Sequence, residues 1–318
     1  MKIIRGLSFS AALALAATLW PAAAPAQDLV TEAMSSFPAN TVRIEYSSLA
    51  KLRALPDYAA LSHRYTGARL QQLEDSLAQL GIQQEDVDEL VLGWQSQEAG
   101  IDFSGVARGR FTAQTVAARA TAQGIAPSPL GGTTAYCLGS GAGGHCIAIL
   151  GDSLGAFGSL EALGAIIKVR AGEVPGAGSD SAFARRVDDA RNDAPIWGVA
   201  IGPAIPDWFK GWLPNQGNAK LDLTQTLQSA EALTYKVQPT DKVRLDIKMD
   251  CKSSQGAANL RQVMQGLKLV QQMAWQSQNP NMPNPFQTLQ VEASDREVRM
   301  NLTTAYAQLE AGNTPGRS

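Results

Sequence analysis

The residues with the clearest chemical potential lie between positions 133 and 153, where two cysteines, a histidine and a serine accompany a glycine-rich stretch. The letters GSGAGG at 139–144 match the spacing of a dinucleotide-binding loop. That loop needs a strand before its glycines and a helix directly after them. The apolar run HCIAIL at 145–150 is too short for the helix and is typical of a strand. The stretch therefore predicts a β-hairpin over 133–150 with the glycines at its tip.

The two cysteines of this hairpin are expected to face each other and to form a disulfide between Cys137 and Cys146. A metal site built from both thiols and His145 is disfavoured, because only three ligands come together and none has the paired spacing of zinc sites. No metal or other cofactor is expected. Cys251 falls on the apolar face of a strand and is interpreted as a free core thiol. The rival pairing joins Cys251 to either of the other cysteines.

The letters GDSL at 151–154 resemble the nucleophile motif of the GDSL esterase and lipase family. In that family a histidine from a late Asp-x-x-His segment activates the serine. Here no histidine follows His145, and the motif stands in the middle of the chain. Without a base, Ser153 is a weak nucleophile. The motif is interpreted as a turn and no catalytic residue is assigned, although a hydrolase whose site is dispersed along the chain stays open.

The first 26 residues are typical of a secretory signal peptide. Lys2 and Arg5 precede an apolar stretch, and small residues at Ala24 and Ala26 fit a cleavage site that would leave Gln27 as the first residue. The apolar stretch is shorter than the roughly 20 residues that cross a bilayer. We therefore expect a periplasmic or secreted protein with no transmembrane segment after cleavage.

The balance of charge gives little support for nucleic-acid binding. Removal of the signal leaves 25 basic against 29 acidic residues, a formal charge of −4. No cluster of Lys and Arg is interleaved with aromatic residues, which is the pattern that phosphate backbones would require. The mature chain is long enough for one large or two medium domains.

The second half of the chain alternates clearly between apolar and charged residues. In DKVRLDIKMDC (241–251) every second residue from Val243 to Cys251 is apolar, which predicts an antiparallel strand with one buried face. A preceding strand over 233–237 forms a hairpin with it, and a long amphipathic helix follows. The helix is indicated by apolar residues at helical spacing, which are Leu260, Val263, Met264, Leu267, Val270 and Met273.

This ββα pattern recurs over 89–124 and 289–309. We therefore expect an α+β, ferredoxin-like fold with two halves of antiparallel sheet, each with helices packed on one face. The expected organisation is a signal peptide over 1–26, an N-terminal half over 27–171, a junction over 172–220, a C-terminal half over 221–310 and a tail over 311–318.

The junction contains IPDWFKGWLP, in which Trp208, Phe209 and Trp212 stand between Pro206 and Pro214. The favoured interpretation is a short helix whose aromatic residues close an open edge of the core. The alternative is a surface that contacts a ligand or a partner, because tryptophan suits positions that are apolar on one side and wet on the other. These three residues are the candidate ligand or partner surface.

The pattern of strands and helices, the glycine-rich hairpin and the tryptophan-containing junction together resemble exported bacterial proteins of uncharacterised function that are built from repeated ββα units. The resemblance implies the architecture and transfers no functional residue. The main hypothesis is a non-catalytic binding or scaffold module of the cell envelope, with an unidentified partner that is either an envelope protein or an apolar ligand. The alternatives are a carrier of a lipid or other apolar ligand, and the dispersed hydrolase.

Overall fold

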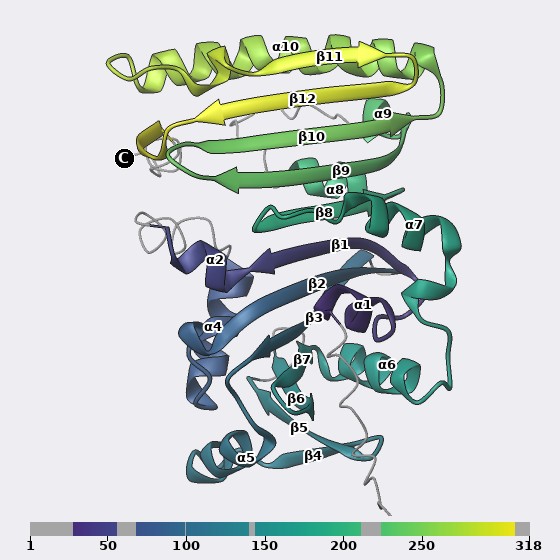
Figure 1. Ribbon diagram of the computed structural model, residues 1–318, viewed down its shortest axis with the longest axis vertical. Helices are drawn as coiled ribbons and strands as arrows, with labels where there is room; N and C mark the ends of the chain where they lie inside the picture. The colour runs from purple at the N-terminus through teal and green to yellow at the C-terminus, as the bar shows by residue number, and fades with distance from the viewer. Residues whose placement is uncertain (1–27, 56–67, 99, 140–143, 211–223, 309–318) are drawn as a thin grey trace, which may run out of the picture.

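The computed structural model of the chain describes residues 28–55, 68–98, 100–139, 144–210 and 224–308 (Figure 1). Within them, twelve strands form one antiparallel sheet in the order β11-β12-β10-β9-β8-β1-β2-β3-β7-β6-β5-β4. The strands are β1 (Thr41–Ser48), β2 (Val87–Gln97), β3 (Gly100–Gly109), β4 (Pro127–Leu130), β5 (Thr133–Leu138), β6 (His145–Gly151), β7 (Leu154–Gly158), β8 (Ile196–Ile201), β9 (Ala230–Pro239), β10 (Val243–Cys251), β11 (Gln290–Ser294) and β12 (Glu297–Thr304).

The helices are α1 (Leu29–Met34), α2 (Leu49–Arg53), α4 (Ala68–Gln79), α5 (Ala113–Ala122), α6 (Leu160–Arg170), α7 (Ser181–Ala190), α8 (Ala204–Lys210), α9 (Thr224–Leu227) and α10 (Ser254–Gln278). The described residues also include the short 3-10 helices η1 (Gln84–Asp86), η3 (Ala177–Ser179) and η4 (Pro285–Gln287). The mixture of helices with an antiparallel sheet confirms the expected α+β class.

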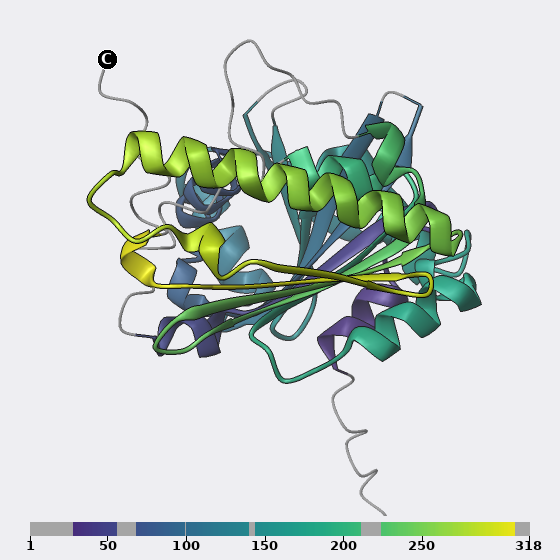
Figure 2. The same ribbon diagram turned by 90° about the horizontal axis from the view of Figure 1, so that it is seen from above.

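The helices cover both faces of the sheet, which corrects the expectation that they pack on one face. Val91 of β2 belongs to a core with α1, α6 and α7, whereas the next residue, Leu92, belongs to a core with α4 and α5. The same division occurs on β8, where Val199 joins the first core and Ala200 joins a third core with α8 and α10. Figure 2 shows α10 along one side of the strands and α1 on the other.

The C-terminal strands follow their alternating sequence as expected. Leu245, Ile247 and Met249 of β10 are buried against α8 and α10. The intervening charged residues lie on the opposite face, where Asp246 pairs with Lys236 and Lys248 pairs with Glu297. We call this the outer face, and its charged residues are Lys236, Arg244, Asp246, Lys248, Asp250, Glu297 and Arg299. Alternation is clear here because one face is core and the other is wet.

The ferredoxin-like repetition of ββα units is not confirmed. Hairpins followed by helices occur as β2-β3-α5, β6-β7-α6 and β9-β10-α10. However, α5 and α6 contribute to different cores on opposite faces, so these units do not repeat one arrangement. The third expected unit, over 289–309, begins with the β11-β12 hairpin, and its helix reaches the limit of the described residues.

The sheet is continuous across the expected junction, because β8 of that segment pairs with β1 on one side and with β9 on the other. Its sequence, IWGVAI, does not alternate because both of its faces are buried. The expected division into two halves stays a prediction. The expected signal peptide and Trp212 lie outside the described residues. In the described part of the chain, we find no helix with the length and apolar character needed to cross a membrane.

Candidate functional site: an apolar cavity beneath α10

A cavity of about 100 Å³ lies between α10, α8 and the strands β10 and β12. We call it the α10 cavity. Its lining is almost wholly apolar and consists of Trp208, Phe209, Leu245, Ile247, Met264, Leu267, Lys268, Gln271, Phe286, Leu289, Met300 and Leu302. It thus contains two of the three aromatic residues that the sequence indicated as a candidate surface.

The aromatic end of the cavity is formed by α8. Trp208 and Phe209 are 3% and 5% exposed, which agrees with the interpretation that they close the core. Their rings meet edge to face with centroids 5.0 Å apart, and Trp208 also packs on Tyr235 of β9 at 4.9 Å. Such contacts fix ring positions beyond what apolar burial alone provides. The candidate surface therefore faces the interior at Trp208 and Phe209.

The opposite wall is α10, whose N-cap residue is Ser253. The Ser253 hydroxyl accepts a hydrogen bond from the Gly256 N–H at 3.0 Å and so caps the helix. Ala257, Leu260 and Met264 are buried on the face of the helix that meets the sheet. The buried face matches the predicted stripe at Leu260 and Met264, but the prediction is wrong for Val270 and Met273, which are 40% and 65% exposed.

Three polar contacts fix the later part of α10 to the segment before β11. Lys268 Nζ donates to the Leu289 carbonyl at 2.6 Å, and Gln272 Nε2 donates to the Phe286 carbonyl at 3.1 Å. In the reverse direction, Asn284 Nδ2 donates to the Gln272 carbonyl at 2.8 Å. Lys268 is thereby held at the side of the cavity.

The lining residues define two different ends. Trp208, Phe209, Met264, Gln271 and Met300 are buried. Leu267, Lys268, Phe286, Leu289 and Leu302 are partly exposed. The aromatic wall at Trp208 and Phe209 is therefore shielded from solvent, whereas the lining residues that reach solvent include Lys268.

A polar cluster lies behind the aromatic end, at the middle of the sheet. Tyr235 donates a hydrogen bond to Glu45, and Arg43 forms an ion pair with Glu45 at 2.9 Å. The Arg43 guanidinium lies 3.8 Å from the centre of the Trp94 ring. Burial, together with the charge of Glu45, raises the pKa of the Tyr235 phenol far above its ordinary value. Tyr235 therefore acts as a neutral hydrogen-bond donor and not as a base.

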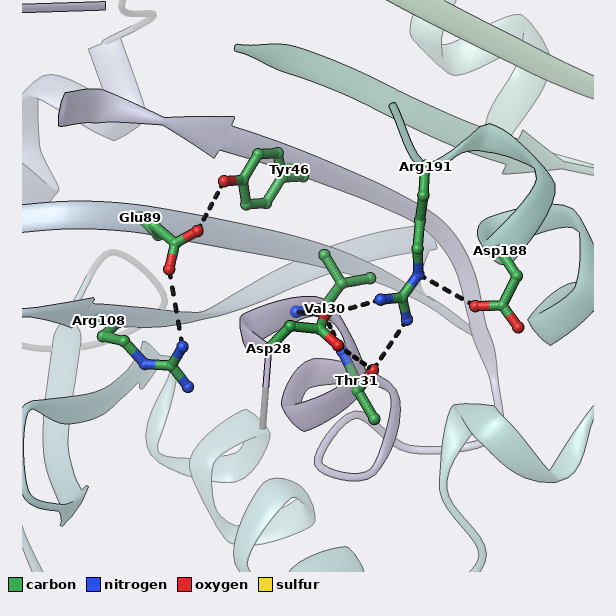
Figure 3. Close-up of polar contacts among 8 residues, drawn as sticks. All are labelled: Asp28, Val30, Thr31, Tyr46, Glu89, Arg108, Asp188 and Arg191. Carbon is green, nitrogen blue, oxygen red and sulfur yellow. Dashed lines mark hydrogen bonds and ion pairs between the residues drawn. The ribbon is translucent and has the colours of Figure 1, made fainter. Parts of the chain in front are cut away.

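The face that carries α1 has its own polar contacts, which Figure 3 shows. Tyr46 donates to Glu89 at 2.7 Å, and Arg108 approaches the same carboxylate at 3.7 Å. Nearby, Asp28 caps α1 and pairs with Arg191 at 2.7 Å. Tyr46, Glu89 and Arg108 thus interact across neighbouring strands, and Asp28 and Arg191 join the start of α1 to the end of α7. We assign both sets a structural role.

The two strands of the glycine-rich hairpin pair as expected, whereas residues 140–143 of its predicted tip lie outside the described residues. Cys137 and Cys146 face each other on β5 and β6 and are joined by a disulfide. Cys251 is free and buried, as expected, and burial raises the pKa of its thiol. Because Cys137 and Cys146 are joined in the disulfide, neither has a free thiol for the disfavoured metal site. Among the described residues, no group of three or more His, Cys, Asp or Glu side chains is arranged to hold a metal ion.

The GDSL letters form the turn between β6 and β7. Ser153 has a φ of 60°, and its carbonyl accepts a hydrogen bond from the Gly109 N–H at 3.0 Å. His145 begins β6, whereas Ser153 follows the end of that strand. At about 3.3 Å per residue, the strand holds the two side chains roughly 20 Å apart. Ser153 and His145 therefore do not form a nucleophile and base pair.

Sequence reasoning identified the aromatic wall of the cavity but missed Lys268, Gln271 and Phe286. A signal for the first two was present. Both stand on the inner stripe of α10, between the buried Met264 and Trp275, at positions where an apolar residue would be expected. Polar residues on the core stripe of an amphipathic helix indicate a place where the core is open.

The fold defines an α+β protein with one long antiparallel sheet that is covered by helices on both faces. No protein-family model and no curated protein sequence matches the chain. Its structure is similar to two crystal forms of TP0453. Form III has a TM-score of 0.52 at 9% identity, covering 88% of this chain and 96% of that one. Form I has a TM-score of 0.52 at 10% identity, covering 88% and 95%. At such identities the similarity concerns the fold alone.

Proposed function

We propose that the protein is an exported, non-catalytic binding module of the cell envelope and that the α10 cavity holds an apolar part of its ligand. One observation carries the proposal: Trp208 and Phe209 line a cavity that reaches solvent, instead of filling the core completely. Export to the periplasm or beyond the cell is supported by the signal-like first 26 residues and by the disulfide.

The size of the cavity limits what it takes up. Pockets for whole drug-sized ligands measure about 300–1,000 Å³, and an apolar cavity of about 150 Å³ holds one benzene. The α10 cavity, at about 100 Å³, matches a small apolar group or the end of a chain. This scale favours a module that grips part of a ligand over a carrier that encloses a whole lipid.

A second candidate is a scaffold that binds a protein through the outer face of β9, β10 and β12. Charges of both signs alternate there, with Lys248 between Asp250 and Glu297 at 3.3 Å from each. Such a flat, mixed surface suits a partner with complementary charges. Replacement of Lys248 by Glu distinguishes the candidates, because it disturbs the outer face and leaves the α10 cavity intact.

Native mass spectrometry of protein purified without detergent tests the main proposal. We expect a non-covalent ligand, or a 1:1 complex with added n-octanol, in the wild-type protein. Leu302→Trp fills the open end of the cavity and should abolish the complex. Met273→Gln is the matched control, because Met273 is 65% exposed on the opposite side of α10. If octanol bound equally to the wild type and to Leu302→Trp, the cavity would not be the binding site.

A further inference from the structure

We propose that the α10 cavity selects an anionic amphiphile: an unbranched alkyl chain end lies against Trp208 and Phe209, and its negatively charged head group pairs with Lys268. This inference rests on the proposed function and specifies the class of ligand. Three properties of the site favour such a ligand: its charge, the difference in polarity between its two ends, and its volume.

The charge of the lining has one sign. Lys268 is the one ionisable residue among the lining residues that the structure describes. The sequence of α10 also contains two cations, Arg261 and Lys268, and no Asp or Glu. A cationic head group would therefore meet repulsion without a carboxylate to balance it, whereas an anionic head group meets an ammonium.

The ammonium is placed to bind such a head group. Its bond to the Leu289 carbonyl uses one of its three N–H donors, so donors remain for a carboxylate, sulfate or phosphate oxygen. Because Lys268 is half-buried, a charge-assisted hydrogen bond there is screened less than one at the open surface.

The two ends of the cavity match the two ends of an amphiphile. The buried lining residues are aromatic or aliphatic except for Gln271, whereas the partly exposed lining residues include Lys268. A ligand with its tail inward keeps its head in contact with water. At about 100 Å³ the buried part accepts a few carbons, and a slim alkyl end suits that volume better than a ring system.

Isothermal titration calorimetry with three eight-carbon probes tests the inference: n-octanoate, n-octanol and n-octyltrimethylammonium, each below its micellar concentration. We expect octanoate to bind at one site at least about tenfold more tightly than octyltrimethylammonium, with octanol between them. Lys268→Gln should weaken octanoate binding about tenfold and change octanol binding by less than about twofold. Lys268→Arg should retain the preference for octanoate.

Arg261→Gln is the matched control, because it removes the other cation of α10 at an exposed position that does not line the cavity. It should leave all three affinities unchanged. Equal binding of octanoate and octanol to the wild type would overturn the inference and leave the proposed function standing. Failure of all three probes to bind, or binding that persists in Leu302→Trp, would reject the proposed function as well. If Lys268→Gln does not fold, the order of the three probe affinities for the wild-type protein still tests the inference.

Discussion

Trp208 of α8 packs against Tyr235 of β9 with ring centroids 4.9 Å apart, and Tyr235 in turn donates a hydrogen bond to Glu45 of β1. One tyrosine thus joins the wall of the α10 cavity to the ion pair of Arg43 and Glu45 at the middle of the sheet. Because Trp208 and Tyr235 are each 3% exposed, the contact between their rings is shielded from water. The aromatic wall of the cavity is therefore packed into the core and joined to the polar cluster of the sheet.

Trp208→Ala should lower the free energy of unfolding by about 3–5 kcal/mol, because it removes a buried indole and uncovers Tyr235. Trp208→Phe keeps an aromatic ring in contact with Tyr235 and should cost less. Urea unfolding followed by circular dichroism measures both values. A loss below about 1 kcal/mol for the alanine variant would show that Trp208 does not support the core.

Replacement of both Cys137 and Cys146 by Ser should lower the free energy of unfolding by roughly 2–3 kcal/mol, because the disulfide closes a short loop in the unfolded chain. Peptide mapping of the non-reduced protein should find these two cysteines joined. Cys251, which is 1% exposed, should react with iodoacetamide only after denaturation. A peptide that joins Cys251 to either partner would contradict the register of β5 and β6.

The sequence predicted β10, in which one face is wet, and missed β8, in which both faces are buried. β10 was recognised because Asp246 and Lys248 interrupt its apolar residues, whereas β8 has no such interruption around Trp197 and Val199. The pairing of β1 with β8 joins residues far apart in the chain, such as Ile44 and Val199. Hydrophobic periodicity contains no information about such partners, so the continuity of the sheet was not predicted.

The candidate site was predicted in part for the same reason. Trp208 and Phe209 were recognised by residue type, which reports burial and contact area. The cavity itself depends on how α10 meets β10 and β12, and a space left between elements has no sequence pattern of its own. Only Lys268 and Gln271, as polar residues on an inner helical stripe, marked its position.

Protein recovered from the cell envelope should begin at Gln27, because Ala24 and Ala26 fit the small-residue preference of signal peptidase. N-terminal sequencing or intact-mass measurement of the exported protein gives the result directly. Replacement of Ala26 by a bulky residue such as Phe should slow cleavage and leave the longer form in the membrane fraction. Recovery of Met1 on mature envelope protein would contradict the assignment of a signal peptide.

Asp28 accepts hydrogen bonds from the Val30 and Thr31 N–H groups at the start of α1 and pairs with Arg191. Burial alone would raise its pKa, but the bonds to Thr31 and the charge of Arg191 outweigh burial, so the pKa lies below 3.8. A lowered pKa in the folded state stabilises the protein at pH values above the unfolded pKa, and this contribution is lost as the pH falls through the folded value. Asp28→Asn keeps the helix cap and removes the charge, so it should destabilise the protein at pH 7 and have a smaller effect near pH 3. Chemical unfolding at both pH values measures the difference, and an equal effect at the two would show that the Asp28 charge does not contribute to stability.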